Sequence, residues 1–147
     1  MKAINECKMT LLSRSANEGF ARVAVSSFIA QLDPTIEELS DIKTAVSEAV
    51  TNCIVHAYRE TLGKIYITVS IYEQRKIRIV IRDAGCGIAD VKQAMEPLFT
   101  TAGGERAGLG FAVMESFMDK LQVKSKQGKG TTVTLQKQLS LRAGIHE

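Results

Sequence analysis

Cysteine, proline and tryptophan are scarce in this chain of 147 residues, which has three cysteines, two prolines and no tryptophan. The cysteines (Cys7, Cys53 and Cys86) are odd in number, widely spaced and without a CxxC pair, which argues against a disulfide framework and a zinc site. No apolar run approaches the ~20 residues that cross a bilayer. The first residues also lack the apolar stretch of a signal peptide. We therefore expect a cytoplasmic protein whose core needs no covalent or metal staple.

The composition is that of one globular domain. Apolar residues make up 45% of the chain, charged residues 24%, and the formal net charge is +3. A single domain over residues 1–147 is expected from the length. The basic stretch at Lys124, Lys126 and Lys129 has no aromatic residues between its lysines, so it is interpreted as a solvated strand and turn. No direct contact with nucleic acid is expected.

The N-terminal half predicts an edge strand, through about Leu12, followed by two helices. Ser15 and Glu18 have the capping-box spacing, and Thr35 with Glu38 repeats it before a helix that should reach about Tyr58. The first helix should bury the apolar positions at helical spacing, namely Phe20, Val23, Ala24, Ser27 and Phe28. The second should bury Leu39, Ile42, Val46, Ala49 and Cys53.

The C-terminal half alternates strands with one long glycine-rich loop. Isoleucine and valine at every second position predict an antiparallel hairpin of strands over 65–72 and 77–81. A loop over 83–110, with at most a short helix near 90–94, precedes a helix over 109–121 and strands over 122–125 and 131–139. That helix should bury Leu109, Ala112, Val113, Ser116 and Phe117. The order of elements predicts an α+β two-layer sandwich, with helices on one face of a mostly antiparallel sheet.

The second helix carries a carboxylate and an amide that could act together. Glu48 and Asn52 are one turn apart and therefore share a side of the helix. They are either two solvated residues or a general base beside a magnesium ligand.

Glycines surround two further candidate groups. Asp83 ends a strand, and Gly85 and Gly87 would let the backbone approach a ligand there. Gly108 and Gly110 precede a helix whose N-terminus could bind an anion. Arg106 lies just upstream and could add charge-assisted hydrogen bonds to a phosphate. Neither the Walker A pattern nor the third glycine of a dinucleotide-binding loop is present.

These clusters, with Gly128–Thr132, resemble the N, G1, G2 and G3 boxes of the gyrase, Hsp90, histidine-kinase and MutL (GHKL) ATPase superfamily. The resemblance covers nearly the whole chain and implies a Bergerat-type ATP-binding fold. Within the superfamily, the segments 47–52, 97–101, 128–133, 20–23 and 31–34 resemble the sporulation anti-sigma F factors.

The resemblance implies a role for each matching residue. Asp83 would accept a hydrogen bond from the adenine amino group, supported by Thr132, and Asn52 would bind Mg²⁺. Glu48 would be the general base and Arg106 would contact the γ-phosphate. Gly85 and Gly87 would let the nucleotide approach the backbone, and Gly108 and Gly110 would present N–H groups to the phosphates. Residues 100–106, including Thr100 and Thr101, would form the lid, and Leu109 would also contact the nucleotide. Arg22 matches a position that contacts partner proteins.

The family also implies a function. Its members are dimeric ATP-dependent serine kinases that hold an RNA polymerase sigma factor inactive and phosphorylate an anti-anti-sigma factor. Three alternatives stay open: a kinase of the stress-response sigma B type, a nucleotide-dependent sigma-binding module without kinase activity, and a histidine-kinase fragment. The last is disfavoured because neither His56 nor His146 lies on a dimerisation helix.

Overall fold

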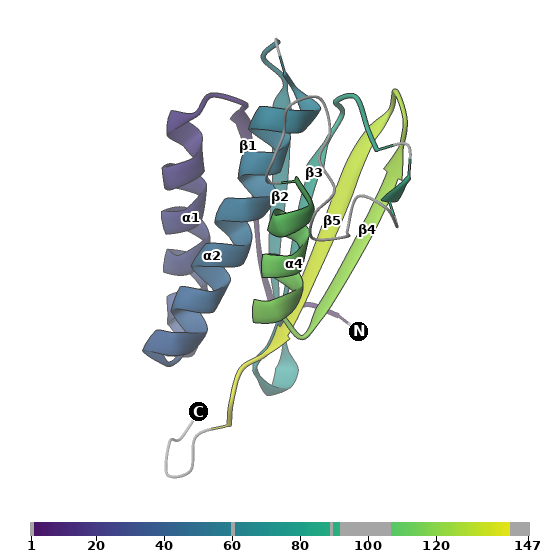
Figure 1. The fold of residues 1–147 in the computed structure, drawn as a ribbon. Coiled ribbons are helices and arrows are strands. Elements are labelled where there is room, and N and C mark those ends of the chain that lie inside the picture. Colours follow the sequence, from purple (N-terminus) through teal and green to yellow (C-terminus); the bar gives the residue numbers. More distant parts are fainter. Residues whose placement is uncertain (1, 60, 89, 92–106, 142–147) are drawn as a thin grey trace.

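The described part of the chain folds into two layers, a five-stranded sheet and a layer of helices on one of its faces (Figure 1). This computed structural model describes residues 2–59, 61–88, 90–91 and 107–141. The strands are β1 (Asn5–Leu12), β2 (Lys64–Tyr72), β3 (Lys76–Asp83), β4 (Lys120–Lys126) and β5 (Gly130–Gln138). The helices are α1 (Ala16–Ile29), α2 (Ile36–Asn52) and α4 (Ala107–Phe117).

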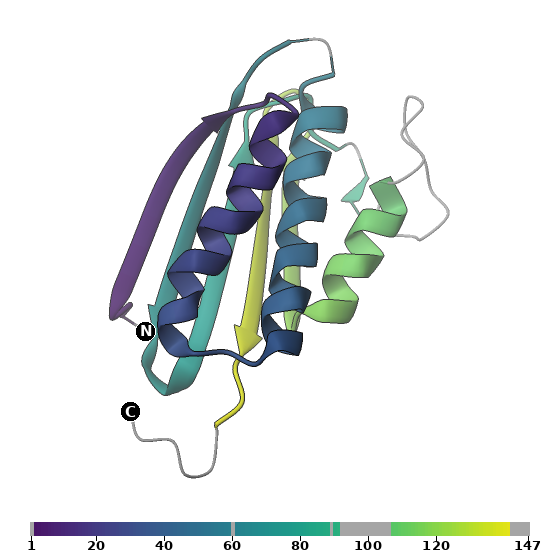
Figure 2. The same cartoon turned by 90° about the vertical axis from the view of Figure 1, so that its left-hand side faces the viewer.

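The sheet has the order β1-β2-β3-β5-β4, and every neighbouring pair is antiparallel. The predicted α+β sandwich is therefore confirmed, as are the β2–β3 hairpin and the edge position of β1. Figure 2 shows α1, α2 and α4 side by side on the same face of the sheet. The predicted short helix near 90–94 lies largely outside the described residues. No helix in the described residues combines the length and the apolar character needed to span a membrane.

The core lies between the isoleucine-rich face of the central strands and the helices. Because strand side chains alternate, every second residue of β2 and β3 points toward α1 and α2. The largest fully buried side chains of the core include Ile65, Ile67, Ile71, Ile77, Ile79, Ile81, Ile29 and Ile42. Burying one such side chain is worth roughly 2 kcal/mol, so this contact between the layers is the main source of stability.

The capping box predicted for α2 is confirmed, whereas the one predicted for α1 is wrong. The Thr35 hydroxyl accepts from the N–H of Glu38, and the Glu38 carboxylate accepts from the N–H of Thr35. Ser15 precedes α1 but its side chain makes no capping hydrogen bond. The Glu18 carboxylate, which would complete the capping box of α1, instead accepts the hydroxyl proton of Ser47 and pairs with Arg22.

The buried faces predicted for two helices are partly wrong. In α1 the sheet side consists of Ala21, Val25, Ser26 and Ile29, while Phe20 and Val23 are more than half exposed, at 56% and 55%. In α4 the buried side is formed by Gly110, Phe111 and Met114, with Met118 just beyond the helix, and Phe117 is exposed. The apolar residues allowed two overlapping faces in each helix, and the approach to the sheet selected the other one.

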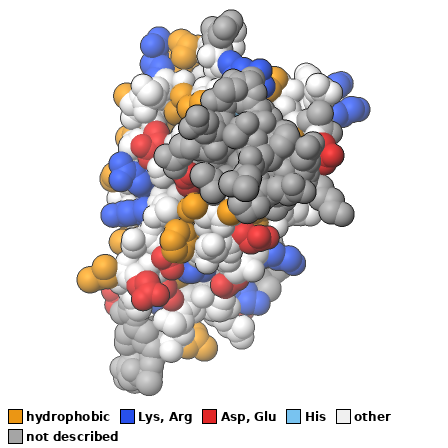
Figure 3. Space-filling model, viewed as in Figure 1, with side chains coloured by type: hydrophobic (Ala, Val, Ile, Leu, Met, Phe, Trp, Pro, Cys, Tyr) orange, Lys and Arg blue, Asp and Glu red, His pale blue; other side chains and the backbone are white. Residues whose placement is uncertain are grey.

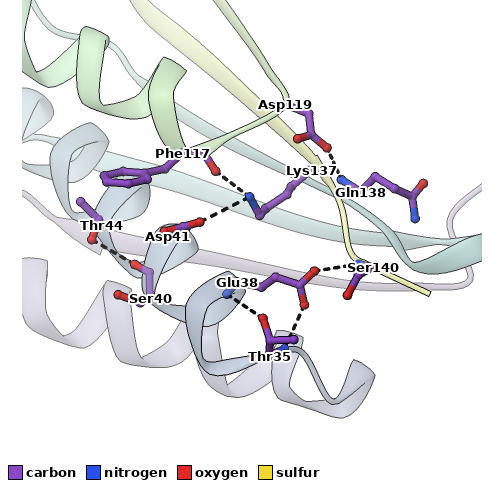
Figure 4. Close-up of polar contacts among 10 residues, drawn as sticks. All are labelled: Thr35, Glu38, Ser40, Asp41, Thr44, Phe117, Asp119, Lys137, Gln138 and Ser140. Carbon is purple, nitrogen blue, oxygen red and sulfur yellow. Dashed lines mark hydrogen bonds and ion pairs between the residues drawn. The ribbon is translucent and has the colours of Figure 1, made fainter. Parts of the chain in front are cut away.

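The end of β5 is tied to both neighbouring helices (Figure 4). Beyond that strand, the N–H of Ser140 donates to the Glu38 carboxylate at 2.7 Å. The ammonium of Lys137 donates to the carbonyl of Phe117 at 2.7 Å and lies 3.8 Å from the Asp41 carboxylate. These contacts join the first half of α2, the end of α4 and the sheet. They hold the helices against the sheet at the end away from Asp83.

Candidate functional site

Asp83, the last residue of the central strand β3, is buried where the glycine-rich segment begins, with 5% of its surface exposed. Its Oδ1 accepts the N–H groups of Gly85 at 2.9 Å and Thr131 at 3.2 Å. Burial raises the pKa of this carboxyl above its usual value, although these N–H donors oppose the change. Oδ2 accepts only the weak thiol donor of Cys53, at 3.5 Å, among the hydrogen bonds found in the described chain. Oδ2 is thus the oxygen best placed to accept a further hydrogen bond.

Cys53 was predicted only as a core residue, but the structure places it against Asp83. It is the first residue after α2, where the helix widens into a π-helical turn over Cys53–Ala57. Such turns are uncommon and are frequent at functional sites. Burial, followed by the nearby Asp83 charge, raises the pKa of the Cys53 thiol well above its ordinary value, so the thiol stays protonated and donates. No pattern in the sequence distinguishes this cysteine from the rest of the apolar stripe.

The threonine beside Asp83 is Thr131 and not Thr132. In the register of β3 and β5, Thr131 is paired with Asp83, while Thr132 is paired with Arg82. Because alternate residues face opposite sides, Thr132 lies on the side of the sheet without helices. The prediction that Thr132 supports Asp83 is therefore wrong by one residue. The Thr131 hydroxyl is buried and lies 2.7 Å from that of Ser125.

Gly85 and Gly87 are both required by the local backbone. A Cβ on Gly85 would lie 2.4 Å from the carbonyl oxygen of Ala57, so a side chain does not fit against the π-helical turn. Gly87 has φ +73°, and a Cβ there would lie 2.2 Å from the Lys126 carbonyl oxygen. The Tyr58 hydroxyl also accepts the N–H of Ala84 at 2.6 Å and donates to the Lys64 carbonyl at 2.8 Å. The segment after Asp83 is consequently held against the end of α2.

Glu48 and Asn52 face the first half of α4. The C-terminal end of α2 and the N-terminal end of α4 lie side by side (Figures 1 and 2), and the two helices are in contact. A Cβ on Gly110 would lie 3.4 Å from both amide atoms of Asn52 and 3.6 Å from Oε1 of Glu48. Glu48 is 8% exposed, so the interpretation of Glu48 as a solvated carboxylate is wrong.

The amide nitrogen of Asn52 is buried and makes no hydrogen bond within the described chain. A buried polar atom without a partner costs about 1–3 kcal/mol, so a ligand at this position would remove a penalty. An amide offers an oxygen in place of the nitrogen after a half-turn of the side chain. Mg²⁺ commonly takes one or two protein oxygens together with substrate phosphates. Asn52 therefore fits a site for a metal-bound nucleotide.

Arg22 lies on the outer side of α1 and is linked to α2. Its Nε lies 3.3 Å from Oε2 of Glu18, and the same oxygen accepts the hydroxyl proton of Ser47 at 2.7 Å. Ser47 directly precedes Glu48 in the sequence. The partner-binding candidate and the candidate base are thus joined through Glu18, a connection that the sequence analysis missed.

The structure places the remaining predicted residues only in part. Gly108 and Leu109 lie in the first turn of α4. Thr100, Thr101 and Arg106 lie outside the described residues. The described site therefore consists of Asp83 with its hydrogen-bond partners, the Glu48–Asn52 side of α2 and the start of α4.

Comparison with known proteins shows which families this chain resembles. The family described as histidine kinase-like ATPase domain matches residues 12–137. The anti-sigma F factor of Caldanaerobacter subterraneus subsp. tengcongensis is 56% identical over 138 residues, covering 93% of this chain and 96% of that protein. The anti-sigma F factor of Clostridium novyi is 55% identical over 138 residues, covering 92% of this chain and 95% of that protein.

A solved structure shares the fold. The RsbU and RsbW domains of a Mycobacterium tuberculosis protein superpose with a TM-score of 0.71 at 20% identity, covering 97% of this chain and 35% of that one.

Proposed function

Because the chain belongs to the anti-sigma F factor family and carries a histidine kinase-like ATPase domain, we propose that it binds and inhibits an RNA polymerase sigma factor of the sporulation type. It would also use ATP to phosphorylate a serine of the anti-anti-sigma factor that antagonises it. An ATPase domain of this family binds a nucleotide, and the two functions would be coupled through that site. Homodimerisation is part of the proposal, by analogy with the family.

The observation that carries the proposal is the pairing of a buried carboxylate with a second polar cluster. Asp83 has one oxygen left to accept the adenine amino group. Across the site, Glu48 and the unsatisfied amide of Asn52 lie against the glycine at the start of α4. The N-terminus of a helix favours anionic groups because its N–H groups and dipole point at the ligand. This arrangement supports adenine binding at Asp83 and phosphate binding near Gly108 and Gly110.

In the proposed reaction, the serine oxygen of the antagonist attacks the γ-phosphorus while the bond to the ADP oxygen breaks. The Glu48 carboxylate takes the proton from the serine hydroxyl. Mg²⁺, held by Asn52, would neutralise phosphate charge when bound. Arg106 would contact the γ-phosphate, Thr100 and Thr101 would form part of the lid over the nucleotide, and Leu109 would line the nucleotide.

The surface of α1 supports the proposed role of Arg22 in partner binding. Phe20 and Val23 are exposed beside it on the outer side of the helix. Arginine and aromatic residues are typical energetic anchors of protein interfaces. An exposed phenylalanine next to a positioned arginine therefore fits a docking surface for the sigma factor or the antagonist.

The test uses the purified chain, γ-labelled ATP, and the sigma factor and antagonist that co-purify with it from its native host. Glu48→Gln should keep nucleotide and sigma-factor binding and lose phosphorylation by at least a hundredfold. Asp83→Asn should weaken ATP binding itself. Glu37→Gln, an exposed acid in the first turn of α2, is the matched control and should behave like the native chain.

Two results would change the assignment. If the chain binds the sigma factor only with nucleotide but transfers no phosphate to the antagonist, it is a sigma-binding module without kinase activity. Phosphate recovered on a histidine would place the activity with the histidine kinases. Failure of the chain to bind ATP would overturn the proposal as a whole.

A further inference from the structure

The face of the sheet without helices is strongly basic. The three helices α1, α2 and α4 all cover one face of the sheet (Figure 2), and alternate residues of each strand point to the other face. Six lysines and two arginines of this side are exposed, namely Lys8, Lys64, Lys76, Lys120, Lys124, Lys126, Arg78 and Arg82. We call these residues the basic sheet face. Glu6 is the acidic residue on this side among the described strand positions, and it accepts from Ser70 at 3.0 Å and lies 3.7 Å from Lys8.

Strand register places these charges in rows across the sheet. Arg78 is paired with Gln136, which is paired with Lys120, so two cations lie on either side of one amide. Arg82, Thr132 and Lys124 form a second such row. Neighbouring strands are about 4.8 Å apart, so the two cations of a row lie roughly 10 Å from one another. The face therefore presents positive charge in two dimensions rather than along one strand.

A hollow of about 420 Å³ lies at the end of this face away from Asp83. Lys76, Arg78 and Lys120 line it together with Gln136 and Gln138. The cationic groups are thus accompanied by amides that can both donate and accept hydrogen bonds. Asp119 also lines the hollow, and its carboxylate accepts the N–H of Gln138 at 2.6 Å.

The rest of the surface does not share this charge. The chain as a whole has a formal net charge of only +3, so the residues outside the basic sheet face together carry a net negative charge. In Figure 3, which has the viewpoint of Figure 1, acidic and basic side chains are mixed over the coloured part of the surface. Positive charge is concentrated where no helix covers the sheet, and a concentrated field of one sign attracts polyanions.

The lysines near residue 124 gave no expectation of nucleic-acid binding from the sequence alone, but strand pairing adds cations of three other strands to the same face. We therefore propose that the basic sheet face binds single-stranded nucleic acid through its phosphates. Phosphate contacts come mainly from lysine and arginine, with help from polar side chains such as threonine and glutamine, and this face contains both classes. Antiparallel sheets bind single strands in several protein families, usually with bases stacked on aromatic side chains, so this face would hold the phosphates without base stacking. The major groove of a duplex instead admits a protruding helix or ribbon. A second copy of this chain would bring like charges together.

An acidic protein partner fits the face less well. Lysine is depleted in protein interfaces, which depend on exposed aromatic or apolar anchors. On this face Tyr72 is 9% exposed, and the guanidinium of Arg82 covers the ring of Tyr66 at 4.1 Å. Contacts would thus be electrostatic and largely independent of base sequence.

The experiment measures the fluorescence anisotropy of a labelled 20-nucleotide poly-U RNA titrated with the full chain. Binding should weaken with added salt by a slope of about −0.7 per phosphate contacted, or about −3 for four contacts, on logarithmic axes. Arg78→Glu with Lys120→Glu should weaken binding by at least tenfold. Arg14→Glu with Lys43→Glu makes the same change of charge outside the basic sheet face and should change binding by less than twofold.

Two further measurements keep the outcome decisive. ATP calorimetry on each variant reports whether it is folded, and Arg78→Gln with Lys120→Gln is a milder version should the reversal fail to fold. No RNA binding at about 50 mM salt, or equal losses in the two double variants, would overturn the proposal. Equal affinity for poly-glutamate would indicate that the face binds an acidic protein and would overturn the proposal. Tighter binding of a 20-base-pair duplex than of the single strand would also overturn it.

Discussion

The thiol of Cys53 donates to Oδ2 of Asp83 across 3.5 Å, which connects the end of α2 to the end of β3. Both groups are buried, and each affects the protonation of the other. The Asp83 carboxylate raises the pKa of the thiol, and the thiol hydrogen bond lowers the pKa of the carboxyl. The proposed adenine contact would use the same carboxylate oxygen.

Nucleotide affinity should fall with acidification because of Asp83. Burial raises the pKa of its carboxyl, so the folded chain takes up a proton at a higher pH than the unfolded chain. Protonation on Oδ2 removes the acceptor for the adenine amino group. Stability should change in the opposite sense, since the unfavourable burial of a charge is relieved as the pH falls through that pKa. Calorimetry with ATP at several pH values checks the first effect, and urea unfolding checks the second.

Cys53→Ala should shift the loss of nucleotide affinity on acidification to higher pH. Removing the thiol donor raises the pKa of Asp83 further, so half of the nucleotide affinity is lost at a higher pH than in the native chain. Cys86→Ala is the matched control, because its exposed thiol donates to the His56 carbonyl and not to Asp83. The same calorimetric series measures both variants. An unchanged profile in Cys53→Ala would show that the contact does not affect the carboxyl.

Thr131→Val should weaken ATP binding about three- to tenfold, the equivalent of one hydrogen bond of 0.5–1.5 kcal/mol. The Thr131 hydroxyl is buried beside Asp83 and contacts Ser125. Thr132→Val should have little effect, because that side chain lies on the side without helices. Calorimetry on the pair compares two threonines that are adjacent in sequence. A larger loss in Thr132→Val would contradict the register argument.

Gly110→Ala should retain or raise thermal stability while reducing nucleotide binding and phosphoryl transfer. Alanine is favoured over glycine in a helix by up to about 1 kcal/mol. The added methyl would, however, lie 3.4 Å from the Asn52 amide, where the metal-bound phosphates are proposed. Gly19→Ala in α1 is the control, since its methyl would meet only the end of the Arg22 side chain, at 3.6 Å. Thermal unfolding and ATP calorimetry on both variants separate the two effects.

Thr35→Ala should lower the free energy of unfolding by about 1 kcal/mol, because it removes the capping box of α2. Ser15→Ala should leave it nearly unchanged, since the Ser15 side chain makes no capping hydrogen bond. Urea unfolding of the two variants measures this difference directly. Equal losses would mean that Ser15 caps α1 in solution.

Local chemistry in the sequence determined much of this protein. Alternating isoleucines specify the β2–β3 hairpin because strand side chains alternate, and Thr35 with Glu38 specifies the start of α2 because its N–H groups need acceptors. The residues at Asp83, Glu48 and Asn52 could be selected as a site because their types and order match a known family.

Only the tertiary structure decided which of several equivalent faces is buried and which residues are opposite one another. Phe20 and Val23 are as apolar as Val25 and Ile29, yet they remain exposed, because the approach of α1 to the sheet is a collective result of packing. Thr131 and Thr132 differ by a single position, and strand register alone places the first beside Asp83. Lysines and arginines from four strands form one basic face for the same reason, since contacts between distant segments are set by the sheet and not by neighbours in the chain.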